Sequence, residues 1–101
     1  MAKTQNESIT KNKHEYAEPK MYNVVFLNDD VTTVEFVVEV LLTHFNKTER
    51  EASDIVDLIN NEDRAIVGTY YHDVADAKAN LVMQKAKASN YPFQVTIEEV
   101  E

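Results

Sequence analysis

The chain contains no cysteine, no tryptophan, one glycine and two prolines among its 101 residues. Without cysteine, it can form neither a disulfide nor a thiolate metal site. One glycine cannot build the glycine-rich loop that binds a nucleotide phosphate. No apolar run approaches the roughly 20 residues that span a bilayer, and the N-terminus lacks the apolar stretch of a secretory signal. We therefore expect a soluble, cytoplasmic protein that has no membrane partner.

Basic residues are also scarce, with 10 Lys and Arg against 18 Asp and Glu, so the formal net charge is −8. The imbalance is concentrated after residue 20, because residues 1–20 hold four lysines against three glutamates. An acidic body repels phosphate backbones, so nucleic acid is not an expected partner. It attracts cations, including a protonated chain terminus. The alternative is that the acidity serves only to keep a small protein in solution.

Side chains that could perform catalysis are few and scattered. His14, His44 and His72 have no second histidine or carboxylate at the spacing of metal ligands. No serine lies in the setting of a nucleophile elbow. The adjacent Asp29 and Asp30 could carry out acid–base chemistry, although a solvated turn also explains them. We expect no catalytic residue, no metal and no cofactor, and hence a protein that is not an enzyme.

The hydrophobic pattern divides the chain near residue 20. Residues 1–20 are polar and lack apolar periodicity, which predicts a mobile tail, and residues 21–101 are expected to form one small domain. Residues 22–27 are β-branched and aromatic, which indicates a strand that stops at 28–30. Thr32 and Glu35 fit a capping box with Thr32 as N-cap, and apolar residues then recur at helical spacing up to residue 45.

The rest of the chain alternates between helices and strands in the same way. A second capping box at Thr48 begins a helix whose apolar face reaches Ile59, and residues 60–63 have the composition of a turn. Residues 65–70 predict a strand, residues 73 to about 90 a helix, and residues 93–98 a half-buried strand. The order β-α-α-β-α-β predicts an α+β fold, a three-stranded sheet with three helices on one face.

The segment Met21–Asp30, followed by Thr32 and by residues 35–37, resembles the start of the ClpS domain. Residues 65–68, 74–78 and 91–93 also match that family's spacing, so the resemblance covers residues 21 to about 98. It implies a monomeric, non-enzymatic adaptor with the same β-α-α-β-α-β fold. Such an adaptor binds substrate proteins by a bulky apolar or aromatic first residue and delivers them to a ClpA-like AAA+ unfoldase for degradation.

The resemblance also implies roles for individual residues. The substrate amino group would be bound by Asn28, Asp29, Asp30 and Asn60. The pocket for the first side chain would be lined by Leu27, Thr32, Val34, Val37, Val56, Ile59 and Phe93. The N-terminal domain of the unfoldase would contact Asp73 and Lys78, both expected to be solvated. For each apolar member of the pocket, plain core packing is the alternative explanation.

Three positions depart from the usual family pattern. The family usually has a histidine where Asn60 stands, a glycine at position 63 and a methionine where Val34 stands. Two alternative functions therefore stay open. One is a ClpS-like regulator that contacts the unfoldase without recognising N-terminal residues. The other is a protein-interaction domain like that of a ribosomal stalk protein, which has a related fold.

Overall fold

Six elements follow one another along residues 19–101, the part of the chain that the computed structural model describes. They are β1 (Met21–Leu27), α2 (Val34–His44), α3 (Glu49–Glu62), β2 (Arg64–Tyr71), α4 (His72–Ala88) and β3 (Val95–Glu99). The predicted order of strands and helices is confirmed. Residues 1–18 of the expected tail lie outside the described residues.

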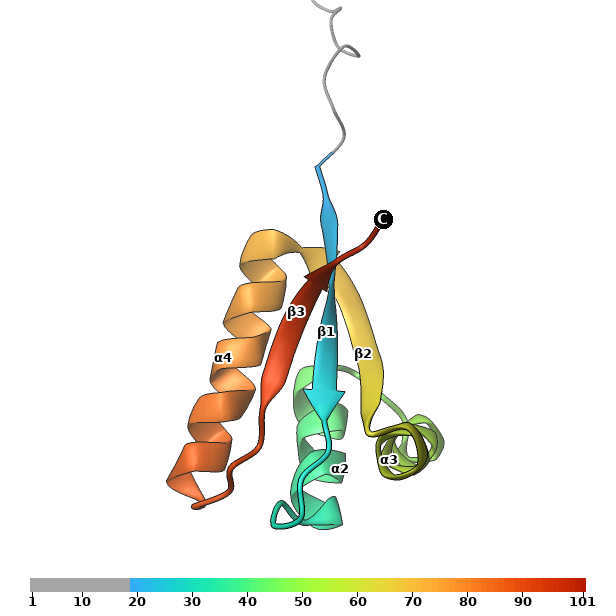
Figure 1. Ribbon diagram of the computed structural model, residues 1–101, viewed down its shortest axis with the longest axis vertical. Helices are drawn as coiled ribbons and strands as arrows, with labels where there is room; N and C mark the ends of the chain where they lie inside the picture. The colour runs from blue at the N-terminus through green and yellow to red at the C-terminus, as the bar shows by residue number, and fades with distance from the viewer. Residues whose placement is uncertain (1–18) are drawn as a thin grey trace, which may run out of the picture.

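The three strands form an antiparallel sheet in the order β2-β1-β3, with β1 in the centre. Figure 1 shows this sheet in front, α2 behind it, and α4 and α3 at its two sides. The register of β1 and β2 shifts between Val24 and Val25, because Val24 pairs with Gly68 and Val25 with Ile66, so that Val67 has no counterpart on β1. A Cβ atom on Gly68 would lie only 2.4–2.7 Å from the ring and hydroxyl of Tyr70, so a larger residue here would require the Tyr70 ring to shift.

The core fills the space between the sheet and the three helices. Phe26 of β1 is fully buried and makes edge-to-face contacts with Phe45 and Phe93, a favourable arrangement of aromatic rings. The helices bury mainly small or branched side chains: Phe36, Val37, Val40 and Leu41 from α2, Ala52, Ile55 and Ile59 from α3, and Ala75, Ala79, Val82 and Ala86 from α4. The alanines of α4 allow its backbone to approach the sheet closely.

The start of α2 differs from the prediction by one residue. Its N-cap is Thr33, whose hydroxyl accepts a hydrogen bond from the N–H of Phe36. Thr32 does not cap the helix because its hydroxyl donates to Asp29. The second predicted capping box is confirmed, since Thr48 and Glu51 bond reciprocally at the start of α3.

The predicted turn at residues 60–63 was wrong, because α3 continues through Glu62. The end of α3 still packs against the core, because Ile59 is buried there. The helix ends at Asp63, which adopts a left-handed conformation with φ of 68°. The other boundaries moved by one or two residues, and Phe93 precedes β3 instead of belonging to it. Among the described residues, no helix is long and apolar enough to cross a membrane.

Candidate functional site

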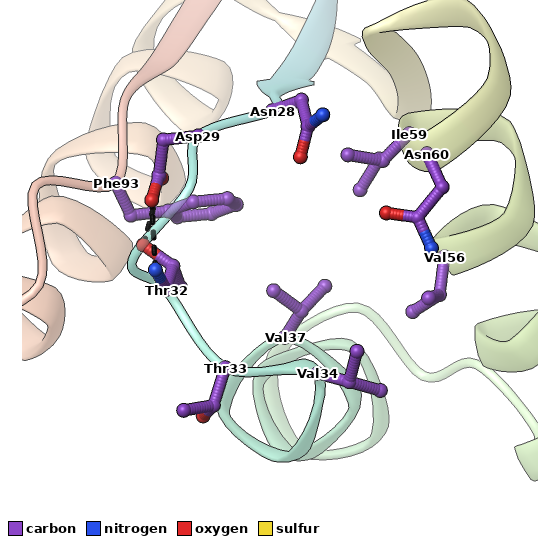
Figure 2. Close-up of a pocket in the computed structure, with 10 residues that line it drawn as sticks. All are labelled: Asn28, Asp29, Thr32, Thr33, Val34, Val37, Val56, Ile59, Asn60 and Phe93. Carbon is purple, nitrogen blue, oxygen red and sulfur yellow. Dashed lines mark hydrogen bonds between the residues drawn. The ribbon is translucent and has the colours of Figure 1, made fainter.

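A pocket lies where β1 ends, between the start of α2, the end of α3 and the segment before β3. Its ten lining residues are Asn28, Asp29, Thr32, Thr33, Val34, Val37, Val56, Ile59, Asn60 and Phe93. Figure 2 shows their side chains arranged around a central hollow. The cavity encloses about 30 Å³, which is room for little more than one water molecule.

The loop after β1 is shaped by Asp29. One carboxylate oxygen, Oδ1, accepts hydrogen bonds from the N–H groups of Val31 and Thr32 at 2.8 and 2.7 Å, and Oδ2 accepts one from the Thr32 hydroxyl at 2.7 Å. Partial burial acts to raise the pKa of Asp29, but these hydrogen bonds outweigh it and the net pKa is lowered. Asp29 is therefore a carboxylate whose oxygens are largely occupied by its own loop.

Two amide side chains project towards the hollow, one from the end of β1 and one from α3. Figure 2 shows the side-chain oxygens of Asn28 and Asn60 both directed into it. Asn28 is anchored through its backbone, because its N–H donates to the carbonyl of Asp63 at 3.0 Å, just after the end of α3. This bond ties the end of β1 to the end of α3. The two amides therefore face the same space although they are 32 positions apart in the sequence.

The remaining lining is almost entirely apolar. Val37, Ile59 and Phe93 are buried, whereas Val34 is 51% exposed and stands at the rim beside the half-buried Val56. Because Val34 and Val56 come from different helices, the width of the mouth depends on how α2 and α3 pack. The combination of apolar walls and two carbonyl acceptors suits a ligand that has an apolar body and a hydrogen-bond donor at one end.

Most of the residues predicted for the pocket come together here, with two exceptions. Leu27 is half-buried and Asp30 exposed, and neither lines the pocket. Leu27 follows the inward-facing Phe26, so strand alternation directs its side chain to the opposite face of the sheet. The sequence reasoning missed Thr33, whose hydroxyl donates to the Tyr91 hydroxyl at 3.3 Å. Placing the N-cap at Thr33 would have indicated this residue.

The two residues expected to contact the unfoldase have different environments. Asp73 is fully exposed at the start of α4, as predicted. Lys78 is not solvated as expected: its Nζ donates to the carbonyl of His44 at 2.8 Å and lies 5.2 and 5.3 Å from the ring centroids of Phe45 and Tyr70. Helix C-terminal carbonyls and aromatic faces both attract an ammonium. Lys78 therefore connects α4 to the end of α2 and to β2.

No group of three or more His, Asp or Glu side chains among residues 19–101 could hold a metal ion. His44 lies in the last turn of α2 and His72 at the start of α4, and His14 lies outside the described residues. The chemistry of the pocket is thus that of its amides, its single carboxylate and its apolar walls.

Comparison with known proteins agrees with this geometry. The family model described as "ATP-dependent Clp protease adaptor protein ClpS" matches residues 17–96. The ATP-dependent Clp protease adapter protein ClpS of Wolinella succinogenes is 43% identical over 83 residues, covering 82% of this chain and 81% of that protein. The protein of the same name from Campylobacter jejuni is 41% identical over 99 residues, covering 98% of this chain and 99% of its own length.

Similarity extends to a solved structure. Agrobacterium tumefaciens ClpS2, determined bound to L-phenylalaninamide, superimposes with a TM-score of 0.79 at 31% sequence identity, over 82% of this chain and 100% of that one. Sequence identity of this extent over most of the length, together with the shared fold, decides against the alternative of a stalk-like interaction domain. The chain belongs to the ClpS family of ATP-dependent Clp protease adaptor proteins.

Proposed function

We propose that this protein is a non-enzymatic adaptor that binds the first residue of a substrate protein and delivers it to a Clp AAA+ unfoldase. The observation that carries the proposal is the pocket in which apolar walls meet the amide oxygens of Asn28 and Asn60. The ligand named for the Agrobacterium relative, L-phenylalaninamide, has an aromatic side chain and a free amino group. A protein that begins with a bulky apolar or aromatic residue has the same two features.

The amino group of the substrate would lie between Asn28 and Asn60. A chain terminus has a pKa of about 7.7–8.0, so it is largely an ammonium at neutral pH and needs acceptors. The two amide oxygens are directed into the hollow, and Asp29 adds a negative charge beside them. Because the oxygens of Asp29 already accept three hydrogen bonds, we assign it mainly to the loop and to the local potential. The exposed Asp30 would add to that potential.

The energies are of the right size for a reversible adaptor. Each hydrogen bond to a charged group contributes about 1.5–3 kcal/mol, and full burial of a large apolar side chain about 1.5–3 kcal/mol. Two amide contacts with one filled pocket therefore approach the roughly 8 kcal/mol of a micromolar complex. The apolar contacts would come from Thr32, Val34, Val37, Val56, Ile59 and Phe93.

One observation favours a second candidate, a regulator that contacts the unfoldase without recognising N-terminal residues. The cavity of about 30 Å³ is too small for an aromatic ring. Recognition therefore requires the mouth to widen, and Val34, at 51% exposed, is the most exposed of the apolar residues that line it. If the mouth stays closed, the protein would contact the unfoldase but would not bind the N-terminal residues of substrates.

Peptide binding distinguishes the two candidates. Fluorescently labelled peptides that begin with Phe, Leu, Tyr, Trp or Arg are titrated with the protein, each with a free and with an acetylated N-terminus. Recognition predicts binding of the free aromatic and leucine peptides and at least tenfold weaker binding, about 1.4 kcal/mol, after acetylation. Equal affinities for both forms, or no binding of any peptide, would leave only the regulator.

A further inference from the structure

Two hydroxyl groups connect the start of α2 to the segment that follows α4. The hydroxyl of Thr33 donates a hydrogen bond to the hydroxyl of Tyr91 at 3.3 Å. The same Thr33 oxygen accepts the N–H of Phe36 at 3.2 Å as the N-cap of α2. A hydroxyl donates one hydrogen bond and can accept others, so the two contacts are compatible. Because Thr33 and Tyr91 are 58 positions apart, their contact depends on the tertiary structure.

Tyr91 is held by contacts that do not involve its hydroxyl. Asn90 has φ of 64°, its N–H donates to the carbonyl of Lys87 at 3.0 Å, and the N–H of Tyr91 donates to the carbonyl of Ala86 at 2.8 Å. These two bonds form a Schellman motif at the end of α4. The ring of Tyr91 lies edge to face on Phe36, with centroids 5.2 Å apart. The backbone and the ring of Tyr91 therefore stay in place when its hydroxyl loses its partner.

The partner of Tyr91 is next to the rim of the pocket. Thr33 directly precedes Val34, the first residue of α2, and both line the pocket (Figure 2). Phe36 and Val37 follow in the same turn and are buried in the core, so the part of the turn that can move is its exposed beginning. Helix ends fray most readily. The bond between Thr33 and Tyr91 opposes a movement of Val34 away from the mouth.

The hydrogen bond between Thr33 and Tyr91 is weak enough to break when a ligand enters. Its length of 3.3 Å exceeds the usual O–H···O distance of about 2.7–2.8 Å. A bond between two neutral groups changes an equilibrium by a factor of roughly 2–13, and a long bond belongs at the low end of that range. A tryptophan side chain is much larger than that of leucine, so it requires the cavity of about 30 Å³ to widen further.

We propose that Tyr91 is a positioning residue that sets the selectivity of the pocket, because its bond to Thr33 holds Val34 where the mouth is narrow. The bond then disfavours a tryptophan as the first residue of the substrate relative to a leucine. This inference rests on the proposed function for the identity of the ligand. A ligand that binds only the wide form of the pocket loses affinity in proportion to the scarcity of that form. Removal of the bond therefore strengthens the binding of tryptophan more than that of leucine.

The test titrates the full chain with fluorescent peptides that begin with Trp or Leu. Tyr91→Phe removes the hydroxyl and keeps the ring on Phe36. The ratio of the Trp affinity to the Leu affinity should rise about threefold, within the range that one neutral hydrogen bond allows. The matched control is Tyr22→Phe, which removes the hydroxyl of another half-buried tyrosine near the other end of β1 and should leave the ratio unchanged. In a Thr33→Ala background, Tyr91→Phe should no longer change the ratio, because the bond is already lost.

The ratio separates a role in selectivity from a role in stability alone, since a general loss of structure weakens the binding of both peptides equally. Equal changes for the two peptides, or an unchanged ratio in Tyr91→Phe, overturn the inference and leave the proposed function standing. The same rise in the ratio in the Thr33→Ala background also overturns it, because the hydroxyl would then act through another group. Absence of peptide binding by both the native protein and Tyr91→Phe overturns N-terminal recognition and the inference together.

Discussion

The contacts of Lys78 predict a stabilising role that its place in the sequence does not suggest. In Lys78→Met, the alkyl chain keeps most of its packing, but the hydrogen bond to the His44 carbonyl and the contacts over Phe45 and Tyr70 are lost. A hydrogen bond from a charged donor contributes about 1.5–3 kcal/mol, and a cation–π contact about 0.5–1 kcal/mol. Lys78 is only half-buried, so values at the low end apply, and we expect a loss of about 2 kcal/mol in the free energy of unfolding.

Urea unfolding followed by circular dichroism measures this loss. For a domain of this size, about 2 kcal/mol corresponds to a fall of roughly 10 °C in the melting temperature. The matched control is Lys87→Met, which removes an exposed lysine from the last turn of the same helix and should cost at most about 1 kcal/mol through the helix dipole. Equal losses for the two variants, or a loss below about 0.5 kcal/mol for Lys78→Met, would refute the reasoning.

Three further predictions concern the pocket and its supports. Asp63→Gly should raise the free energy of unfolding, measured by denaturant titration, by about 0.5–1 kcal/mol. Asp63 has φ of 68°, a conformation that glycine adopts without strain. A lower stability of the variant would contradict this explanation of the end of α3. The lowered pKa of Asp29 means that its contribution to stability is present above about pH 4 and is lost as the pH falls further. Acid unfolding of Asp29→Asn should therefore be less steep below about pH 4 than that of the native protein, and parallel curves would show that Asp29 contributes nothing there. Binding of Phe peptides by the native protein should be nearly constant between about pH 5 and 7, because Asp29 is the sole acidic or basic side chain that lines the pocket. The Asn60→His variant should lose peptide affinity below about pH 6.5, where an imidazolium at position 60 repels the peptide ammonium. Identical pH profiles for the two proteins would place residue 60 outside the contact.

Local patterns along the chain were sufficient to predict the order of elements and the class of fold. The alternation of β-branched and helical patterns predicted all three strands and all three helices, because hydrophobic periodicity is a local signal. Its errors lay at element ends, where local rules compete. Thr32 satisfied the capping pattern, but its hydroxyl bonds to Asp29, and Thr33 caps the helix instead. The Asn–Asn–Glu–Asp turn composition was overridden by the packing of the last turn of α3 around Ile59.

The tertiary structure alone decided which polar groups face the same space and which are already occupied. Residue types at family positions suggested Asn28, Asp29 and Asn60 together, but they could not show that the carboxylate of Asp29 accepts three hydrogen bonds from its own loop. In the same way, Lys78 has the composition of a solvated helix face, and only the packing of α4 against the end of α2 brings its ammonium to the His44 carbonyl. Hydrogen-bond partners far apart in the chain leave no periodic trace, so the free or occupied state of a polar side chain is decided by the fold.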